Sequence, residues 1–198
     1  GCQGVQVCFA DLNGDGYDDV VVGHSNGKVE LYKGTVEKGR YSSAEELPNG
    51  GDQRSRACSF AYDLSGDGVP ELIIGGFDGR FGLLKMNLGS HESCPHELTD
   101  SNGNPLLVET GRSSPALADV NNDGLVDVLS GDTDGNVWVF LGNLKAKEEG
   151  YELQPESGVL RTDVGSWNGV PICVDANVDN RSNRSRIAFA DINGDGYG

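Results

Sequence analysis

The sequence predicts an all-β fold built from consecutive repeats. The first observation is a nine-residue pattern, Asp11 to Asp19, that recurs three more times along the chain. The second is that each complete copy precedes a short apolar run and a hairpin turn, a combination that favours strands. The third is composition, because 30 of the 198 residues are glycine, as is typical of turn-rich β folds.

The first unit shows the expected order of strands. Apolar and other residues alternate over residues 5–10, as in a strand that leads into the nine-residue pattern. After the pattern, a buried strand is expected at 20–23 and an Asn-Gly hairpin turn at 24–27. Residues 28–33 alternate between polar and apolar, which predicts a half-buried strand. An outer strand is expected near Tyr41.

The later units repeat this order. In the second unit strands are expected at 57–62, 72–75 and 80–84, with an outer strand at 106–108. In the third they are expected at 116–118, 128–131 and 136–141, and a fourth unit begins at 187–190. The first aspartates of the patterns stand at positions 11, 63, 119 and 191, so successive units are 52, 56 and 72 residues apart.

Repeats of this length and strand order are typical of β-propeller blades. We expect one repeat domain, 1–198, with blade-like units at about 5–55, 56–113 and 114–185 and a truncated fourth at 186–198. Closed propellers need about 4–8 blades, so we expect these units to be part of a larger propeller. The open edges, at Val5–Phe9 and at the last strand, should then contact neighbouring blades or subunits.

The recurring pattern has the ligand spacing that a hard cation such as calcium requires. Side chains with oxygen occupy positions 1, 3 and 5, glycine occupies position 6, and three copies have a carboxylate at position 9. Calcium takes about 6–8 oxygen ligands, position 7 would offer its backbone carbonyl, and glycine permits the sharp turn. The predicted ligands are Asp11, Asn13, Asp15, Tyr17 and Asp19; Asp63, Ser65, Asp67, Val69 and Glu71; Asp119, Asn121, Asp123, Leu125 and Asp127; and Asp191, Asn193, Asp195 and Tyr197.

These ligands make three full calcium sites and one partial site. The alternative for a single loop is a polar turn that binds nothing, but four loops in register favour the metal. The second site should bind least tightly, because Ser65 offers a neutral oxygen at position 3.

The charge of the chain restricts its partners. Acidic residues number 31 against 15 basic ones, for a net charge of -16. A protein that binds nucleic acid or an anionic membrane needs a basic surface, so we expect neither as a partner. The acidity is consistent with a solvated surface and with cation binding. No apolar run approaches the ~18 residues of a transmembrane helix, so no transmembrane segment is predicted.

Cysteines and glycosylation motifs indicate an oxidising compartment. The five cysteines and three histidines match no zinc pattern. We expect one or two disulfides, with buried reduced cysteines as the alternative. Asn180 and Asn183 each begin an Asn-X-Ser motif and would carry glycans in a secreted protein. The chain is therefore expected to be extracellular, either secreted or at the cell surface.

Residues 9–23 resemble the FG-GAP/VCBS repeat family, the calcium-binding blades of integrin-α-like β-propellers, and residues 187–197 repeat the resemblance. The resemblance implies that the loops lie between the first two strands of each blade, at one face of the disc. It also implies that calcium is structural, and that ligands bind at the opposite face or at the long connections 34–55, 86–113 and 142–185.

The expected function is a non-enzymatic extracellular module for adhesion, recognition or assembly, with a protein or glycan as partner. No catalytic residue is predicted. The alternative is a propeller segment of a secreted polysaccharide-active enzyme, because some such enzymes resemble this blade type. It would use Trp138, Phe140 and Trp167 as a sugar platform, unless Trp138 and Phe140 are core residues. The cluster His91–His96 could ligate a metal, but it is also typical of a solvated loop.

Overall fold

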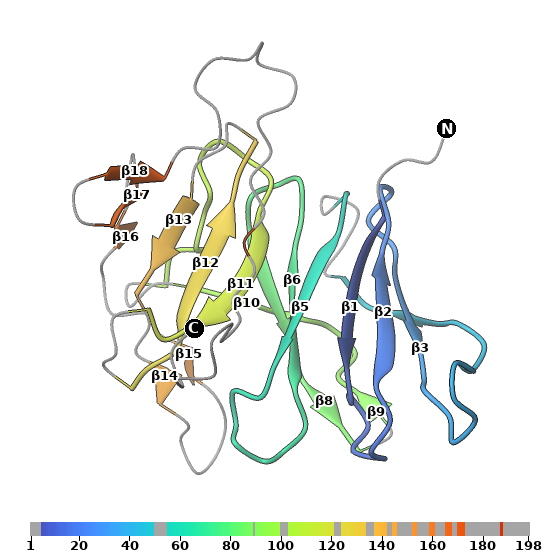
Figure 1. The fold of residues 1–198 in the computed structure, drawn as a ribbon. Helices are drawn as coiled ribbons and strands as arrows, with labels where there is room; N and C mark the ends of the chain where they lie inside the picture. The colour runs from blue at the N-terminus through green and yellow to red at the C-terminus, as the bar shows by residue number, and fades with distance from the viewer. Residues whose placement is uncertain are drawn as a thin grey trace.

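The computed structural model describes residues 5–49, 55–88, 90–99, 103–120, 124–133 and 137–141, with short pieces at 144–145, 152–153, 159–160, 165–167, 170–172 and 187. These residues form strands and turns, and none of them lies in a helix. Three four-stranded antiparallel sheets stand face to face like blades (Figure 1). The prediction of an all-β fold with blade-like units is therefore confirmed for the described part of the chain.

Each four-stranded sheet begins with three strands that follow one another in sequence. The first sheet contains β1 (Gln6–Ala10), β2 (Asp19–Gly23), β3 (Val29–Tyr32) and β4 (Glu45–Leu47). The second contains β5 (Cys58–Tyr62), β6 (Glu71–Gly75), β7 (Phe81–Leu84) and β10 (His96–Glu97). The third contains β11 (Ser114–Ala118), β12 (Asp127–Gly131), β13 (Val137–Phe140) and β16 (Val159–Leu160). The first strands, β1, β5 and β11, lie next to one another (Figure 1).

Three small hairpins complete the described strands. They are β8 (Met86–Asn87) with β9 (Ser90–His91), β14 (Leu144–Lys145) with β15 (Glu152–Leu153), and β17 (Gly165–Trp167) with β18 (Val170–Ile172). The first two follow the third strand of their units, β7 and β13. At the same place in the first unit, after β3, a single bridge joins Gly34 to Tyr41. Each unit therefore has a short β contact just after its third strand.

The predicted outer strands are the part of the fold that the structure corrects. The prediction of a strand at 106–108 is wrong, because the fourth strand of the second sheet is β10. Leu106 and Val108 are 4% and 0% exposed and fill the core, and their N–H groups bond to Leu98 (2.9 Å) and Gly79 (2.9 Å) outside any ladder. Burial between sheets therefore explains their apolar character. In the first unit the outer strand is β4, which begins four residues after Tyr41.

Two hydrophobic clusters hold the sheets together. The cluster between the first and second sheets contains Leu12, Val21, Val29, Leu31, Leu47, Ala57, Val69, Leu72, Ile74, Leu84 and Met86. The cluster between the second and third contains Ile73, Phe81, Leu83, Leu98, Leu106, Val108, Leu117, Val128, Trp138 and Phe140. Alternate residues of β6 enter different clusters, since successive side chains of a strand point to opposite faces. This two-sided burial explains why residues 72–74 of β6 form an uninterrupted apolar run.

The junctions between successive sheets repeat the same backbone bonds. In each, the hairpin turn between the second and third strands accepts two N–H groups from the chain that enters the next sheet. The donors and acceptors are Ala57 to His24 (3.1 Å), Arg56 to Ser25 (3.0 Å), Ser113 to Gly76 (2.9 Å) and Arg112 to Phe77 (3.2 Å). Arg56 and Arg112 have φ values of 60° and 62°, a left-handed conformation uncommon outside glycine. The junction is thus one structural unit that occurs twice.

The outward side of the first sheet carries a polar cluster around Glu30. The Glu30 carboxylate accepts hydrogen bonds from Lys28 Nζ (2.7 Å) and Tyr32 Oη (3.0 Å), and His24 Nε2 lies 3.0 Å from it. The hydrogen bond from Lys28, followed by that from Tyr32, lowers the pKa of Glu30 from 4.5 to about 2. The cluster thus stabilises the ionised carboxylate in the folded protein.

This cluster predicts a loss of stability in acid. Because the pKa of Glu30 is lower in the folded state, its contribution is complete above pH 4.5 and disappears as the pH falls toward about 2. We expect the melting temperature of Glu30→Gln to fall less than that of the parent between pH 5 and pH 2. Glu37→Gln, at an exposed carboxylate in the loop between β3 and β4, is the control and should follow the parent curve. Parallel curves for Glu30→Gln and the parent would contradict the prediction.

Candidate functional site

The first nine-residue loop is folded by its own side-chain oxygens. Asp11 Oδ1 accepts the N–H groups of Gly14 (2.8 Å) and Asp15 (3.2 Å), and Asp11 Oδ2 accepts that of Gly16 (2.8 Å). Asn13 Oδ1 accepts the N–H of Asp15 at 2.8 Å. The side chains at positions 1 and 3 therefore point into the loop, as a cation site there would require.

Asp19, at position 9, anchors the loop to the sheet through two hydrogen bonds. Its side chain is 0% exposed, and its two oxygens accept the N–H groups of Leu12 (3.0 Å) and Gly34 (2.8 Å). Burial raises the pKa of Asp19 above its ordinary value, and the charges of Asp15 and Asp11 act in the same direction. The two N–H hydrogen bonds oppose this shift. A cation bound near a buried carboxylate and two others would lower the free energy of the folded state, because it would offset the repulsion among their charges.

The second and third loops repeat the bonds of the first. In all three, the carboxylate at position 1 accepts the N–H of position 6, and the carboxylate at position 9 accepts the N–H of position 2. The further bonds are Gly68 to Asp63 (2.9 Å), Leu64 to Glu71 (2.8 Å), Gly124 to Asp119 (2.8 Å) and Val120 to Asp127 (2.9 Å). The glycines at position 6 have φ values of 86°, 88° and 83°, so this position has the conformation that its glycine was expected to allow.

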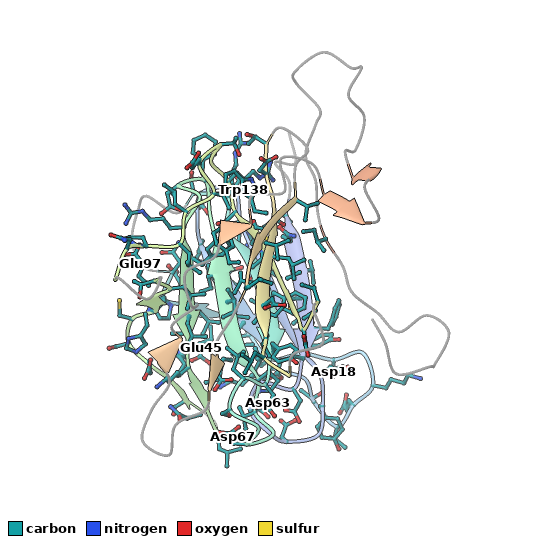
Figure 2. The ribbon with its side chains drawn as sticks, turned by 90° about the vertical axis from the view of Figure 1, so that its left-hand side faces the viewer. Asp18, Glu45, Asp63, Asp67, Glu97 and Trp138 are labelled. Atoms are coloured by element: carbon teal, nitrogen blue, oxygen red, sulfur yellow. The ribbon has the colours of Figure 1, made fainter. Side chains whose placement is uncertain are left out.

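The loops lie at one end of the molecule. Each connects the first and second strands of its sheet, and these strands run in the same direction in all three sheets. In Figure 2, Asp63 and Asp67 of the second loop and Asp18 of the first lie toward one end, whereas Trp138 lies toward the other. The hairpin turns and junctions occupy the end opposite the loops.

The donor set of these loops fits a hard cation. A carboxylate oxygen has two lone pairs, so one that accepts an N–H can still bind a metal. In the described part of the chain, however, no three His, Cys, Asp or Glu side chains converge on one point as a metal-holding group. Several predicted ligands lie outside the described residues: Asn121, Asp123, Asp191, Asn193, Asp195 and Tyr197. Calcium at these loops therefore stays a prediction.

Comparison with known families places the loop in context. Residues 11–74, which run from the first aspartate of the first loop to β6, match the family described as FG-GAP-like repeat. Over these residues the chain is similar to FG-GAP-like repeats. No solved structure matches the chain significantly. The FG-GAP-like match supports a propeller-type repeat module, in agreement with the blade-like sheets.

The aromatic side chains proposed as a sugar platform belong to the core next to the FG-GAP-like segment. Trp138 and Phe140 are each 2% exposed, and their rings stack with centroids 6.5 Å apart. Phe140 also meets Phe81 edge to face at 5.7 Å, and Trp138 Nε1 donates to Asp132 Oδ2 at 2.9 Å. The platform is therefore wrong for these two residues, because burial between sheets leaves no face for a sugar. The side chain of Trp167 lies outside the described residues.

The histidine cluster does not form a joint site. His91 Nε2 lies 3.4 Å from Glu45, in the first sheet, whereas His96 Nε2 lies 2.8 Å from Glu92. Cys94, between them in sequence, is exposed and directs its sulfur toward the Pro95 carbonyl (3.6 Å). The two histidines thus pair with different carboxylates, and each would form an ion pair when protonated.

The expected disulfides find no support among the described cysteines. Cys8, Cys58 and Cys94 form no disulfide, and Cys58 Sγ lies 3.2 Å from Ser114 Oγ. Burial raises the pKa of the Cys8 thiol, as expected for a cysteine packed against the first cluster. Cys2 and Cys173, together with the glycosylation motifs at Asn180 and Asn183, lie outside the described residues. Disulfides that involve Cys2 or Cys173 stay a prediction, with their pairing open.

Two contacts of the first loop were not foreseen from sequence. The N–H of Gly34 supports Asp19 from 15 residues away, and Leu88 of the second unit lies against Gly14. The spacing of ligands within the nine-residue loop does not predict that Gly34 or Leu88 contacts it. The short β8–β9 hairpin that carries Leu88 is too brief to show a strand period.

Proposed function

We propose that this chain is a calcium-binding repeat module of a β-propeller, with calcium in a structural role. The observation that supports it best is the repetition of the same two bonds, position 1 to position 6 and position 9 to position 2, in three loops. Such loops are ordered turns lined with carboxylates that keep further lone pairs. A divalent cation would neutralise part of their charge and hold the first two strands of each sheet together.

Calcium titration of the purified chain tests the proposal. We expect binding at three loops, with the second weakest because the neutral Ser65 Oγ stands at position 3. Asp15→Ala should remove one site, because Asp15 holds position 5 of the first loop. Isothermal titration calorimetry gives the stoichiometry and the dissociation constants.

The matched control is Asp18→Ala. Asp18 is also an exposed aspartate of the first loop, but at position 8, where its side chain is no predicted ligand. It should leave the stoichiometry unchanged. Absence of calcium binding by the parent chain, or equal losses in both variants, would overturn the proposal.

The open side of the first sheet supports membership of a larger array. Val7 and Phe9 are 48% and 62% exposed, whereas Cys8 and Ala10, which alternate with them, pack against the first cluster. On the second and third sheets the corresponding side is covered by the preceding sheet. We propose that a further repeat or subunit covers Val7 and Phe9 in the assembled protein.

The module is proposed to act in adhesion, recognition or assembly outside the cell, with a protein or glycan bound at the long connections. FG-GAP-like repeats are typical of extracellular proteins, which supports this setting. Of the connections, 86–113 is partly core, because Leu98, Leu106 and Val108 are buried, so its exposed remainder and residues 34–49 are the better candidates among the described residues. No observation in the described ranges favours the alternative of a polysaccharide-active enzyme.

Within the described ranges, no helix combines the length and the apolar composition that crossing a membrane would require.

A further inference from the structure

The β8–β9 hairpin of the second unit extends across to the first loop. Its Met86 is buried in the cluster between the first two sheets. A Cβ atom built on Gly14, at position 4 of the first loop, would lie 2.5 Å from Leu88 Cδ2 at the tip of the hairpin. Leu88 therefore contacts the loop through Cδ2, while 74% of the residue stays exposed.

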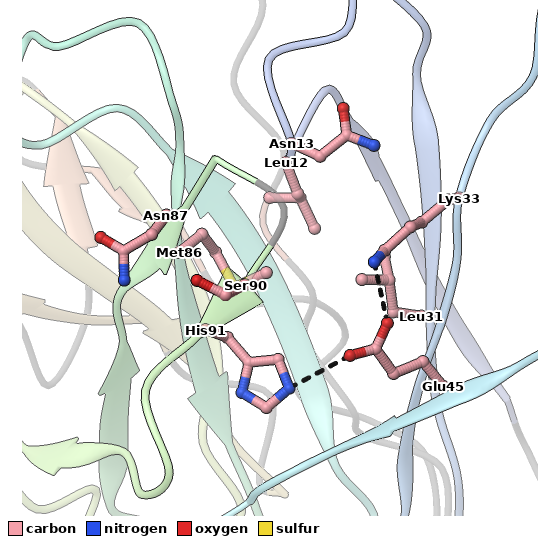
Figure 3. A pocket seen from close by; sticks show the side chains of 9 residues that line it. All are labelled: Leu12, Asn13, Leu31, Lys33, Glu45, Met86, Asn87, Ser90 and His91. Atoms are coloured by element: carbon pink, nitrogen blue, oxygen red, sulfur yellow. Dashed lines mark ion pairs between the residues drawn. The ribbon is translucent and has the colours of Figure 1, made fainter.

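A small cavity marks the place where the hairpin and the first unit meet (Figure 3). Its walls are Leu12, Asn13 and Leu31 on one side and Met86, Ser90 and His91 on the other. Leu12 and Asn13 are positions 2 and 3 of the first loop, and the N–H of Leu12 binds Asp19. The hairpin thus packs along the segment that holds the predicted ligands at positions 1, 3 and 9.

A polar contact fixes the other strand of the hairpin to the first sheet. His91 Nε2 lies 3.4 Å from Glu45 Oε1, and Lys33 Nζ lies 3.0 Å from Glu45 Oε2 (Figure 3). His91 Nδ1 lies 2.7 Å from the carbonyl oxygen of Glu92, which orients the ring. The hairpin consequently contacts the first unit at three residues, Met86, Leu88 and His91.

The second loop adds a further contact to the same position. Val69 Cγ2 lies 3.7 Å from the place of a Cβ on Gly14, and Val69 holds position 7 of the second loop. Two elements of the second unit therefore lie against one side of Gly14, which is otherwise exposed. Gly14 and Gly16 have φ values of 70° and 86°, and glycine loses more backbone entropy on ordering than other residues. Contacts that order these residues before a ligand binds remove part of that cost from the binding step.

We propose that the β8–β9 hairpin is a clasp that sets the cation affinity of the first loop, with Leu88 as its main positioning residue. This inference rests on the proposed function, namely that the first loop binds calcium. The clasp comes from the neighbouring unit, so the affinity of the first loop depends on how the second sheet is docked.

Calcium titration of Leu88→Ser tests the clasp. We expect one of the sites to bind roughly tenfold more weakly, the low end of what supporting residues contribute at metal sites. Leu88→Met, which keeps an apolar side chain of similar size, should restore the parent affinity. Leu107→Ser is the matched control, because Leu107 is an exposed leucine that lies near Gly79 of the second hairpin turn.

A second measurement is independent of calcium. In chelator, hydrogen exchange of the Gly14 and Gly16 amides should be several-fold faster in Leu88→Ser than in the parent chain and in Leu107→Ser. If the parent binds no calcium, the proposed function fails, and the exchange rates alone decide whether the hairpin orders the loop. Unchanged exchange in Leu88→Ser, or an unchanged affinity where the parent does bind calcium, overturns the clasp. Equal changes in Leu88→Ser and Leu107→Ser overturn it as well.

Discussion

Asp19→Ala is expected to lose roughly 2–4 kcal/mol of unfolding free energy, the largest effect of any loop substitution considered for this chain. It leaves one buried donor unpaired, which costs about 1–3 kcal/mol, and a second, half-buried donor that costs less. The donors are the N–H groups of Leu12 and Gly34, which the two Asp19 oxygens now accept. Leu12 is itself fully buried in the first cluster. The loss of Asp19 would thus loosen both the loop and the core, and urea unfolding with added chelator measures the effect without any contribution from bound cation.

Two variants separate the possible causes of that loss. Asp18→Ala removes a neighbouring exposed carboxylate and should change the unfolding free energy by less than about 0.5 kcal/mol. Asp19→Asn keeps one oxygen acceptor and should fall between the parent and Asp19→Ala. If Asp19→Ala and Asp18→Ala unfold at the same urea concentration, the anchoring role of Asp19 is wrong.

Gly75→Ala is expected to weaken the contact between the second and third sheets. A Cβ on Gly75 would lie 2.6 Å from the Ser113 carbonyl oxygen and 2.7 Å from Pro115 Cδ. Both atoms belong to rigid parts of the chain, so the backbones would have to separate. Overpacking of this kind costs about 1–3 kcal/mol and occasionally more. Urea unfolding monitored by the fluorescence of Trp138, which is buried at this interface, reports the change.

The first junction provides an internal repeat of this experiment. Gly23 occupies the same place at the end of β2, and a Cβ there would lie 2.3 Å from the Ala57 carbonyl oxygen. Gly23→Ala should therefore destabilise the chain by a similar amount. Ser43→Ala, at an exposed residue remote from both junctions, is the control. If both glycine variants are as stable as the parent, the backbones at the junctions can separate at little cost and the prediction is wrong.

The apolar pattern of the sequence predicted the inner strands correctly, because the corresponding strand of each unit is buried in the same way. Strands β2, β6 and β12 each follow a loop with fixed ligand spacing, and the glycine that ends each strand marks its boundary. The face that each strand buries was harder to predict. In β1 the larger residues, Val7 and Phe9, point outward, and the smaller ones pack against the second sheet. A single strand cannot show which side its neighbour occupies.

The parts that sequence reasoning missed depend on contacts distant in the chain. Strands β10 and β16 are two residues long, too short for any period to appear. Leu106 and Val108 are apolar, as residues of a strand would be. They are buried between two sheets but lie in an irregular segment. The candidate loops were accessible from spacing alone, since nine adjacent residues contain all their predicted side-chain ligands. Their supports, Gly34 and Leu88, were not.

The repeated junction has a consequence for how such a chain can evolve. The bonds that both junctions share join backbone atoms, and each junction bends at a left-handed arginine, Arg56 or Arg112, so this common turn does not depend on the side chains between the sheets. Those side chains do differ, with small residues such as Ala61 at the first interface and large ones such as Phe60 at the second. Duplication or loss of a whole unit would therefore preserve the curvature of the array while its interfaces diverge.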